Sequence, residues 1–135
     1  MAWSFTSRAP MYMQIVSRIR ADILGGVYQP DQQIPAVRQL AQTAGVNPNT
    51  MQRAFAVLEA EQLFITRGTI GRFITTDTEV LARAREVMRR ETVARLSEEA
   101  AAVGISPAEL IESIRAYESE NAAEKAEASQ ETDTQ

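Results

Sequence analysis

The chain has 135 residues, 44% of them hydrophobic, a formal net charge of −4, and neither cysteine nor histidine. This length fits one globular domain with additional helix, and the apolar content is sufficient for a buried core. Without cysteine and histidine, the chain cannot form a disulfide, a Cys/His zinc site, or a Ser-His or Cys-His catalytic pair. We therefore expect a protein that is not an enzyme and uses no metal or cofactor, although carboxylate-only metal sites remain open.

The sequence carries no signal for a membrane or for export. No apolar stretch approaches the roughly 18 residues that a membrane helix needs. Residues 1–6 lack the basic and apolar blocks of a secretory signal. We expect a soluble cytoplasmic protein with no membrane partner.

The charge is unevenly distributed along the chain. Residues 1–76 carry seven arginines and four acidic residues, which gives +3, whereas residues 77–135 carry seven basic and fourteen acidic residues, which gives −7. The negative total argues mildly against a nucleic-acid partner, but the basic first part favours one. Every basic residue in that part is arginine, which suits bidentate contacts to phosphate and guanine.

Helical spacing of apolar residues predicts a helix that begins at Pro10 and ends at Gly25-Gly26. Its inner face would carry Tyr12, Ile15, Val16, Ile19 and Ile23. A turn at residues 28–31 separates it from a short second helix, for which Pro35 suits the first position. Gly45 would end that helix, and its inward residues would be Val37, Leu40, Ala41 and Ala44.

Asn47 as N-cap and Pro48 as first residue predict a third helix. On a helical wheel its apolar residues gather on one side and its polar residues on the other. The apolar side would carry Met51, Phe55 and Leu58. The polar side would carry Asn49, Gln52 and Arg53.

Two strand-like segments, residues 63–67 and 72–75, are joined by Gly68-Thr69-Ile70-Gly71 and predict a β-hairpin. The order of helices, tight glycine turn and hairpin is that of a winged helix-turn-helix. The small Ala41 and the turn-forming Gly45 lie at the spacing of that motif. We predict a mainly α fold with a small β-hairpin: an N-terminal winged helix-turn-helix plus a C-terminal helical dimerisation segment.

The C-terminal part predicts a long helix from Thr76 to Gly104, then a second helix capped by the sequence at residues 106–109. A helical pair this small cannot bury its apolar stripe alone, so residues 77–120 are expected to form the dimerisation segment. The expected interface residues are Val80, Leu81, Ala84, Val87, Met88, Leu96, Leu110, Ile111 and Ile114. Residues 121–135 lack large apolar residues and are expected to be a disordered acidic tail.

Residues 1–76 form the predicted DNA-binding domain, with Trp3 and Phe5 ahead of the first helix. A helix-turn-helix places the start of its second helix in the major groove of DNA. In this chain that helix is the third predicted one, which begins at Pro48. We expect Trp3 and Phe5 to pack on the acidic part or on a second subunit rather than to bind a ligand.

Candidate DNA contacts follow from the chemistry of base edges and phosphates. Asn and Gln can pair with adenine, and Arg with guanine. Arg38 would lie near phosphate or a guanine edge, whereas Asn47 is either an N-cap or a base contact. The candidate DNA-binding residues are Arg38, Asn47, Asn49, Thr50, Gln52, Arg53, Arg67, Gly68, Thr69 and Arg72. For each arginine, a solvated surface position is the alternative interpretation.

Four segments resemble the GntR family of bacterial transcription regulators: residues 10–15, 34–41, 45–51 and 66–74. The Val-Asn-Pro-Asn-Thr sequence and the short C-terminus are similar to the YtrA-like subfamily. The resemblance implies a homodimer that binds operator DNA, often in control of transporter operons, with the C-terminal helices as dimerisation unit. The resemblance also implies that these residues occupy DNA-contact positions: Arg38, Asn49, Thr50, Gln52, Arg53 and Gly68.

Three positions depart from the family pattern. In the family, a Ser usually precedes the arginine of the second helix, which is Arg38 in this chain. Ala36 takes the place of that Ser, so a helix cap and a possible phosphate-binding hydroxyl are lost. Asp31 replaces the Gly after the turn proline, and Ile70 stands in the wing where a Lys or similar residue is common.

The sequence thus predicts a sequence-specific transcription regulator, a repressor, that binds double-stranded operator DNA with palindromic half-sites as a homodimer. The sequence shows no effector pocket, because a helical pair this small encloses little volume, and the small-molecule effector is unknown. One alternative is a winged-helix protein-interaction module without DNA binding, since fold does not fix function. An RNA-binding winged helix is disfavoured because the polar face offers few aromatic residues for base stacking.

Overall fold

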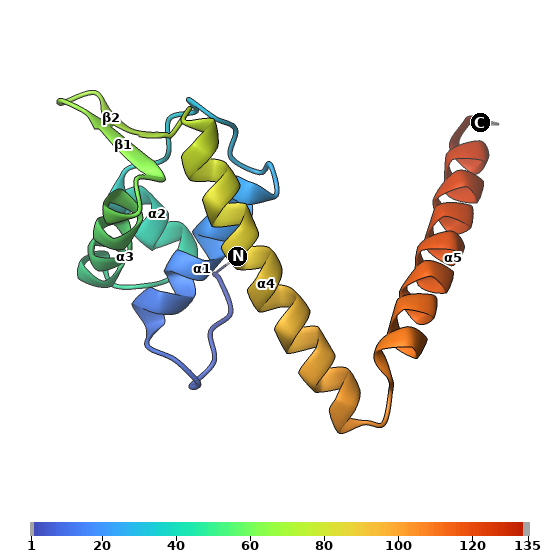
Figure 1. Ribbon diagram of the computed structural model, residues 1–135. Helices are drawn as coiled ribbons and strands as arrows, with labels where there is room; N and C mark the ends of the chain where they lie inside the picture. The colour runs from blue at the N-terminus through green and yellow to red at the C-terminus, as the bar shows by residue number, and fades with distance from the viewer. Residues whose placement is uncertain (1, 134–135) are drawn as a thin grey trace. The chain divides into compact units, whose positions relative to one another are not determined.

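The computed structural model describes residues 2–133 of the chain (Figure 1). The chain divides into two compact units, Met1–Val87 and Met88–Gln135. The predicted boundary after Thr76 therefore falls too early, because the first turns of the long helix belong to the first unit. Met1 and residues 134–135 of the predicted tail lie outside the described residues.

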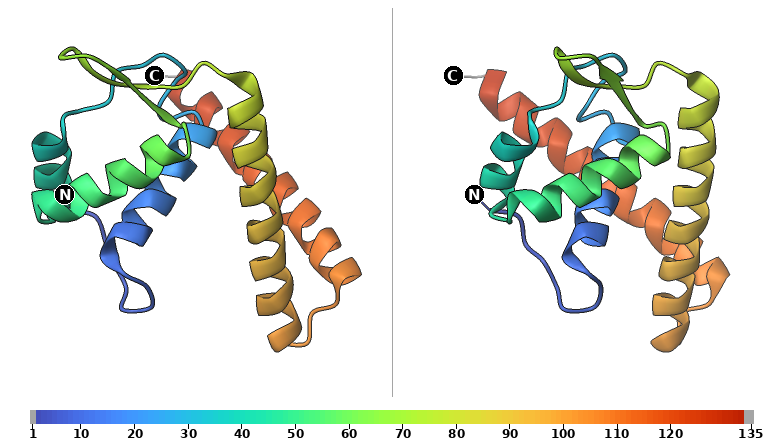
Figure 2. Two further views of the ribbon diagram at one scale, coloured as in Figure 1. Left: turned by 60° about the vertical axis from the view of Figure 1, so that its left-hand side comes forward. Right: turned by 90° about the vertical axis from the view of Figure 1, so that its left-hand side faces the viewer.

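The first unit contains three helices, an antiparallel hairpin and the beginning of a fourth helix (Figures 1 and 2). In chain order the elements are α1 Met11–Leu24, α2 Val37–Ala44, α3 Pro48–Ala60, β1 Phe64–Arg67, β2 Gly71–Ile74 and α4 Thr78–Ala102. This order confirms the predicted fold class, mainly α with one small hairpin, and its winged helix-turn-helix.

The helix boundaries follow from a few local signals. Pro10 is the N-cap of α1, and Gly25 follows its last residue, as predicted. Gly45 adopts a left-handed conformation with φ 76° after α2, which glycine does without steric cost. The prediction for Pro35 was wrong: α2 begins at Val37, and its N-cap Ala36 makes no side-chain capping bond.

One apolar core joins the helices and the hairpin of the first unit. Its largest fully buried side chains are Phe55, Ile15, Ile19, Met51, Leu58, Leu63 and Ile74. The rings of Phe55 on α3 and Phe64 on β1 meet edge to face, with centroids 5.0 Å apart. This core fixes α3 against α1 and the hairpin, so the opposite face of α3 is left to solvent.

The residues before α1 form a segment that lies along the first unit. The Trp3 N–H donates to the Ala44 carbonyl at the end of α2 over 3.1 Å. The Arg18 guanidinium lies 4.2 Å from the Trp3 ring centroid. Trp3 and Phe5 both pack against the core of this unit. Both side chains are half-buried there, and their packing on the acidic part or on a second subunit stays a prediction.

The second unit contains the rest of α4, a turn, and α5 Pro107–Asp133. Gly104 in the turn has φ 80°, and the Ser106 hydroxyl accepts a hydrogen bond from the Glu109 N–H over 3.2 Å. The helix continues to Asp133, so the disorder expected beyond residue 120 is contradicted. That tail is rich in Ala and Glu, which favour helix without any buried stripe. Within residues 2–133, no helix combines the length and apolar character that a membrane crossing needs.

Candidate nucleic-acid interface

The start of α3 is built by its N-cap. Asn47 has an extended backbone, and its side-chain oxygen accepts a hydrogen bond from the Asn49 N–H over 2.8 Å. Pro48, which lacks an N–H, occupies the first helical position. Of the two interpretations of Asn47, the structure confirms the cap. The cap fixes where α3 begins and so which residues lie in its first turn.

The two faces of α3 differ as the helical wheel predicted. Met51, Phe55 and Leu58 are fully buried in the core. The candidate DNA-binding residues lie on the outer side: Asn49, Gln52 and Arg53 are exposed, and Thr50 is half-buried. A continuous polar, hydrogen-bonding surface therefore covers the first turns of α3.

Arg38 lies on α2, where its side chain is exposed. Among the described residues, no carboxylate lies within ion-pair distance of Arg38 or Arg53. Neither guanidinium is therefore compensated by an acidic side chain of the described residues. A positive charge without an internal partner is what an anionic ligand such as a phosphate chain requires.

The two predicted arginines of the hairpin are differently placed. Arg67 forms an ion pair with Asp31 and lies 4.3 Å from the Phe73 ring centroid. Arg72 forms an ion pair with Glu59 of α3, and its side chain is only 26% exposed. Both charges are therefore compensated within the chain, which the sequence pattern did not reveal.

The tip of the hairpin is held by its own backbone. The Ile70 N–H donates to the Arg67 carbonyl over 3.0 Å, and the Gln33 side-chain amide donates to the Ile70 carbonyl over 2.8 Å. Gly71 has φ 135°, and a Cβ there would lie 2.8 Å from the Gln33 amide nitrogen. Gly68 and Thr69 are exposed beside Ile70, whose side chain is 69% exposed. The wing therefore presents a defined, uncharged tip.

Asp31 shows why one departure from the family pattern is tolerated. Its φ of 68° lies in the left-handed region, where glycine is easiest and Asp or Asn is the next most frequent choice. The same residue supplies the carboxylate that pairs with Arg67. The substitution keeps the turn and adds an ion pair to the wing.

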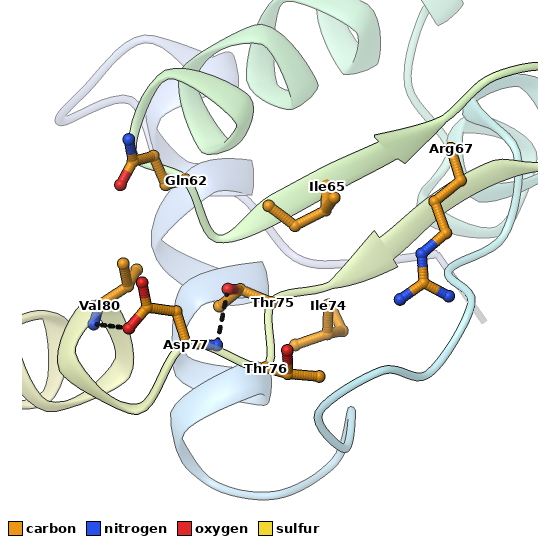
Figure 3. Close-up of a pocket in the computed structure, with 8 residues that line it drawn as sticks. All are labelled: Gln62, Ile65, Arg67, Ile74, Thr75, Thr76, Asp77 and Val80. Carbon is orange, nitrogen blue, oxygen red and sulfur yellow. Dashed lines mark hydrogen bonds between the residues drawn. The ribbon is translucent and has the colours of Figure 1, made fainter.

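An open pocket of about 480 Å³ lies where the hairpin meets the start of α4 (Figure 3). Two of its lining residues, Thr75 and Asp77, cap the start of α4. The Asp77 N–H donates to the Thr75 hydroxyl over 3.1 Å, and the Asp77 carboxylate accepts from the N–H groups of Glu79 and Val80 over 3.0 and 3.4 Å. Part of the polar lining of this pocket therefore serves the start of α4. Within residues 2–133, no three carboxylates gather in an arrangement suited to a metal ion.

The residues predicted for dimerisation fall into two groups. Val80 is 6% exposed in the core of the first unit, and Leu81 and Ala84 pack against that core. Val80 is therefore covered by its own chain, whereas Leu81 and Ala84 are half-buried, and their part in a subunit interface stays a prediction. The other predicted residues are exposed or half-buried: Val87, Met88, Leu96, Leu110, Ile111 and Ile114. Three further apolar residues are exposed: Val103 and Tyr117, which the sequence also predicts on the apolar faces of these two helices, and Val93, which it does not.

The fold and this polar surface define a winged helix-turn-helix DNA-binding protein. Residues 11–74 match the family model described as "Bacterial regulatory proteins, gntR family". The chain is 30% identical to the HTH-type transcriptional repressor YtrA of Bacillus subtilis, over 81% of this chain and 85% of that protein.

Solved structures agree with this match. A GntR family transcriptional regulator from Listeria monocytogenes superimposes with a TM-score of 0.72 at 29% identity, over 82% of this chain and 97% of that one. AraR(DBD) in complex with operator ORX1 superimposes with a TM-score of 0.50 at 27% identity, over 56% of this chain and 99% of that one. The chain therefore belongs to the GntR family, in its YtrA-like subfamily, and is a DNA-binding transcriptional regulator.

Proposed function

We propose that the protein is a repressor that binds a palindromic operator as a homodimer in the cytoplasm. The observation that carries the proposal is the exposed polar face of α3, whose residues Asn49, Gln52 and Arg53 stand outside the core. These are the positions that a helix-turn-helix presents to the major groove. The similarity to a protein named as a repressor, YtrA, supports repression rather than activation.

The proposed contacts follow from side-chain chemistry. Gln52 and Arg53 contact base edges, since they can pair with adenine and guanine. Asn49 and Thr50 contact bases or the adjoining phosphates, and Arg38 contacts a phosphate or a guanine edge. The uncharged wing tip at residues 68–69 approaches the DNA backbone or the minor groove, where small residues permit close contact.

The second unit supports the proposed homodimer. It leaves large apolar side chains at the surface, namely Val93, Leu96, Val103, Ile111, Ile114 and Tyr117, and Val103 is 73% exposed. Each such side chain gains about 1.5–3 kcal/mol on full burial. A second copy offers the same apolar residues, so a symmetric interface would bury both sets. Two copies would also present two α3 helices to half-sites about one DNA turn apart.

The regulated genes are proposed to include a transporter operon, as the resemblance to YtrA-like regulators implies. A nuclease footprint on the promoter of the protein's own operon tests this assignment. We expect one protected region with two inverted half-sites. Repression is then measured with a reporter under that promoter, and a rise in reporter output with added protein would contradict it.

DNA recognition is tested by titrating the protected duplex and a scrambled duplex of equal length. We expect the protected duplex to bind about a thousandfold more tightly at physiological salt. Arg38→Ala should weaken binding about tenfold. Arg83→Ala, which removes an equally exposed arginine from α4, serves as matched control and should leave affinity unchanged. Equal affinity for both duplexes would contradict sequence-specific binding, and no binding at low salt would favour the interaction module.

Dimerisation is tested by sedimentation of the full chain. Leu96→Glu and Ile114→Glu place a charge among the exposed apolar residues of the second unit, and we expect each to shift the protein to monomer. Val27→Glu changes an apolar residue of the first unit that is 66% exposed, so it is a matched control that should stay dimeric. A wild-type protein that sediments as a monomer would contradict the homodimer.

A further inference from the structure

We propose that Tyr12 is a positioning residue for DNA recognition: its ring holds the Arg53 guanidinium in place and leaves the N–H groups of that guanidinium available to DNA. This inference rests on the proposed function, because it takes the start of α3 as the DNA-contacting surface. The sequence predicts Tyr12 only on the inner face of the first helix.

The contact between the two side chains arises from the packing of α1 against α3. Tyr12 is the second residue of α1, and the central carbon of the Arg53 guanidinium lies 3.8 Å from its ring centroid. Cation–π attraction extends to separations of about 6 Å. Tyr12 is half-buried whereas Arg53 is exposed, so a fixed ring supports a side chain that would otherwise move freely.

Comparison with the other stacked arginines shows what is particular to Arg53. Among the described residues, guanidinium groups lie over aromatic rings in the pairs Arg18 and Trp3, Arg53 and Tyr12, Arg67 and Phe73, and Arg72 and Phe55. Three of them also face a carboxylate, and those partners are Asp22, Asp31 and Glu59. Among the described residues, Arg53 alone of the four has no such carboxylate.

The type of partner decides what the guanidinium can still do. A carboxylate cancels the charge and occupies donors that lie in the plane of the guanidinium. An aromatic ring covers one face of that plane and leaves the five N–H donors and the charge unused. Arg53 is therefore held in place and still able to bind a guanine edge or a phosphate.

The surroundings place this guanidinium among other candidate contacts. Tyr12 and Arg53 line an open groove of about 400 Å³ together with Pro10, Met11, Asn49 and Thr50. An arginine that is already ordered loses less conformational freedom when it binds DNA than a free one. Tyr12 thus raises affinity through Arg53, without itself having to contact DNA.

A double-mutant cycle on the full chain tests this coupling. The dissociation constant for the protected promoter duplex is measured for wild type, Tyr12→Leu, Arg53→Gln and the double variant. We expect Tyr12→Leu to weaken binding by about two- to fivefold in wild type, which is the range for an exposed cation–π contact. In the Arg53→Gln background the same substitution should change binding by less than about 1.5-fold.

Two further variants, Tyr12→Phe and Tyr12→Met, distinguish a positioning role of the ring from a role of the hydroxyl and from a loss of stability. Tyr12→Phe keeps the ring and should bind like wild type; a loss as large as that of Tyr12→Leu would assign the effect to the hydroxyl and overturn the proposal. Equal losses in both Arg53 backgrounds would also overturn it. If Tyr12→Leu lowers the melting temperature, Tyr12→Met replaces it in the cycle. A wild-type protein that fails to bind the duplex overturns the proposed function itself, which is a separate outcome.

Discussion

The start of α3 and the wing both carry arginines, but these side chains have different partners. Arg67 and Arg72 of the wing face carboxylates of the same chain, whereas Arg53 on α3 faces an aromatic ring. The positive charge of the first half of the sequence is therefore not spread evenly over the DNA-binding surface. It is compensated at the wing and left without a carboxylate partner at Arg38 of α2 and Arg53 of α3. The number of arginines in the sequence predicts binding to nucleic acid. Which of them can contact nucleic acid depends on the side chains that each arginine already contacts in the fold.

The largest expected effect on DNA affinity comes from comparing the loss of one arginine on α3 with the loss of one arginine in the wing. Arg53→Gln should weaken binding to the protected duplex about tenfold or more, because a bidentate base contact contributes about 1–3 kcal/mol. Arg67→Gln removes the same charge from the wing, and we expect a change below about threefold because that arginine is already paired. Fluorescence anisotropy at one salt concentration measures both. Equal losses would show that the wing arginine also serves DNA.

The second prediction concerns how much the ion pair between Arg72 and Glu59 contributes to the free energy of unfolding. Glu59 accepts hydrogen bonds from Arg72 and, over 3.2 Å, from the Thr66 hydroxyl. Glu59→Gln leaves the partly buried Arg72 without its carboxylate and should lower the free energy of unfolding by about 1–2 kcal/mol. Urea denaturation measures this change. Glu98→Gln, on an exposed part of α4, is the control and should cost less than about 0.5 kcal/mol.

The third prediction concerns a substitution that would leave the wing with an unpaired positive charge. Asp31→Gly keeps the left-handed backbone of the turn and releases Arg67 from its carboxylate. If Arg67 then reaches a phosphate, the slope of log affinity against log salt concentration should steepen by about 0.9. The double variant Asp31→Gly/Arg67→Gln should return the slope to that of wild type. An unchanged slope in the single variant would mean that the wing lies out of reach of DNA.

The smallest effect concerns Asp22, the carboxylate beside the stacked Arg18. Burial raises the pKa of Asp22, and the Arg18 charge opposes this only in part. A raised pKa in the folded state favours folding at low pH, and this contribution is lost as the pH rises through the folded-state pKa. Asp22→Asn should therefore raise stability slightly at pH 7, by less than about 0.5 kcal/mol, and add nothing near pH 3. Melting temperatures at the two pH values measure the difference.

Local signals in the sequence were sufficient for most of the fold. Pro10, Gly45 and the Asn47-Pro48 pair each act on the adjacent backbone, so their effect can be predicted without knowing any distant neighbour. The hairpin followed from β-branched residues around two glycines. Pro35 was misplaced by two residues because a proline fits the extended backbone before a helix as well as its first turn.

What the sequence could not reveal depends on contacts between distant residues. In the sequence, apolar residues recur along the long helix from Val80 to Val103, and nothing in that pattern distinguishes Val80, which the first unit covers, from Val103, which is exposed. The carboxylate partners of Arg67 and Arg72 come from a turn and a helix elsewhere in the chain. The contact of Tyr12 with Arg53 likewise needs α1 and α3 to be packed first. The polar face of α3 was predictable because it depends on one helix alone.

The segment before α1 has a practical consequence for experiments with this protein. The Ala2 methyl group lies 2.9 Å from where a Cβ on Gly45 would stand, and Trp3 is hydrogen-bonded to the end of α2. A fusion partner or dye attached at the N-terminus would thus be tethered beside the turn that joins α2 to α3. Fluorescent or affinity labels for DNA-binding measurements therefore belong at the C-terminal end of the chain.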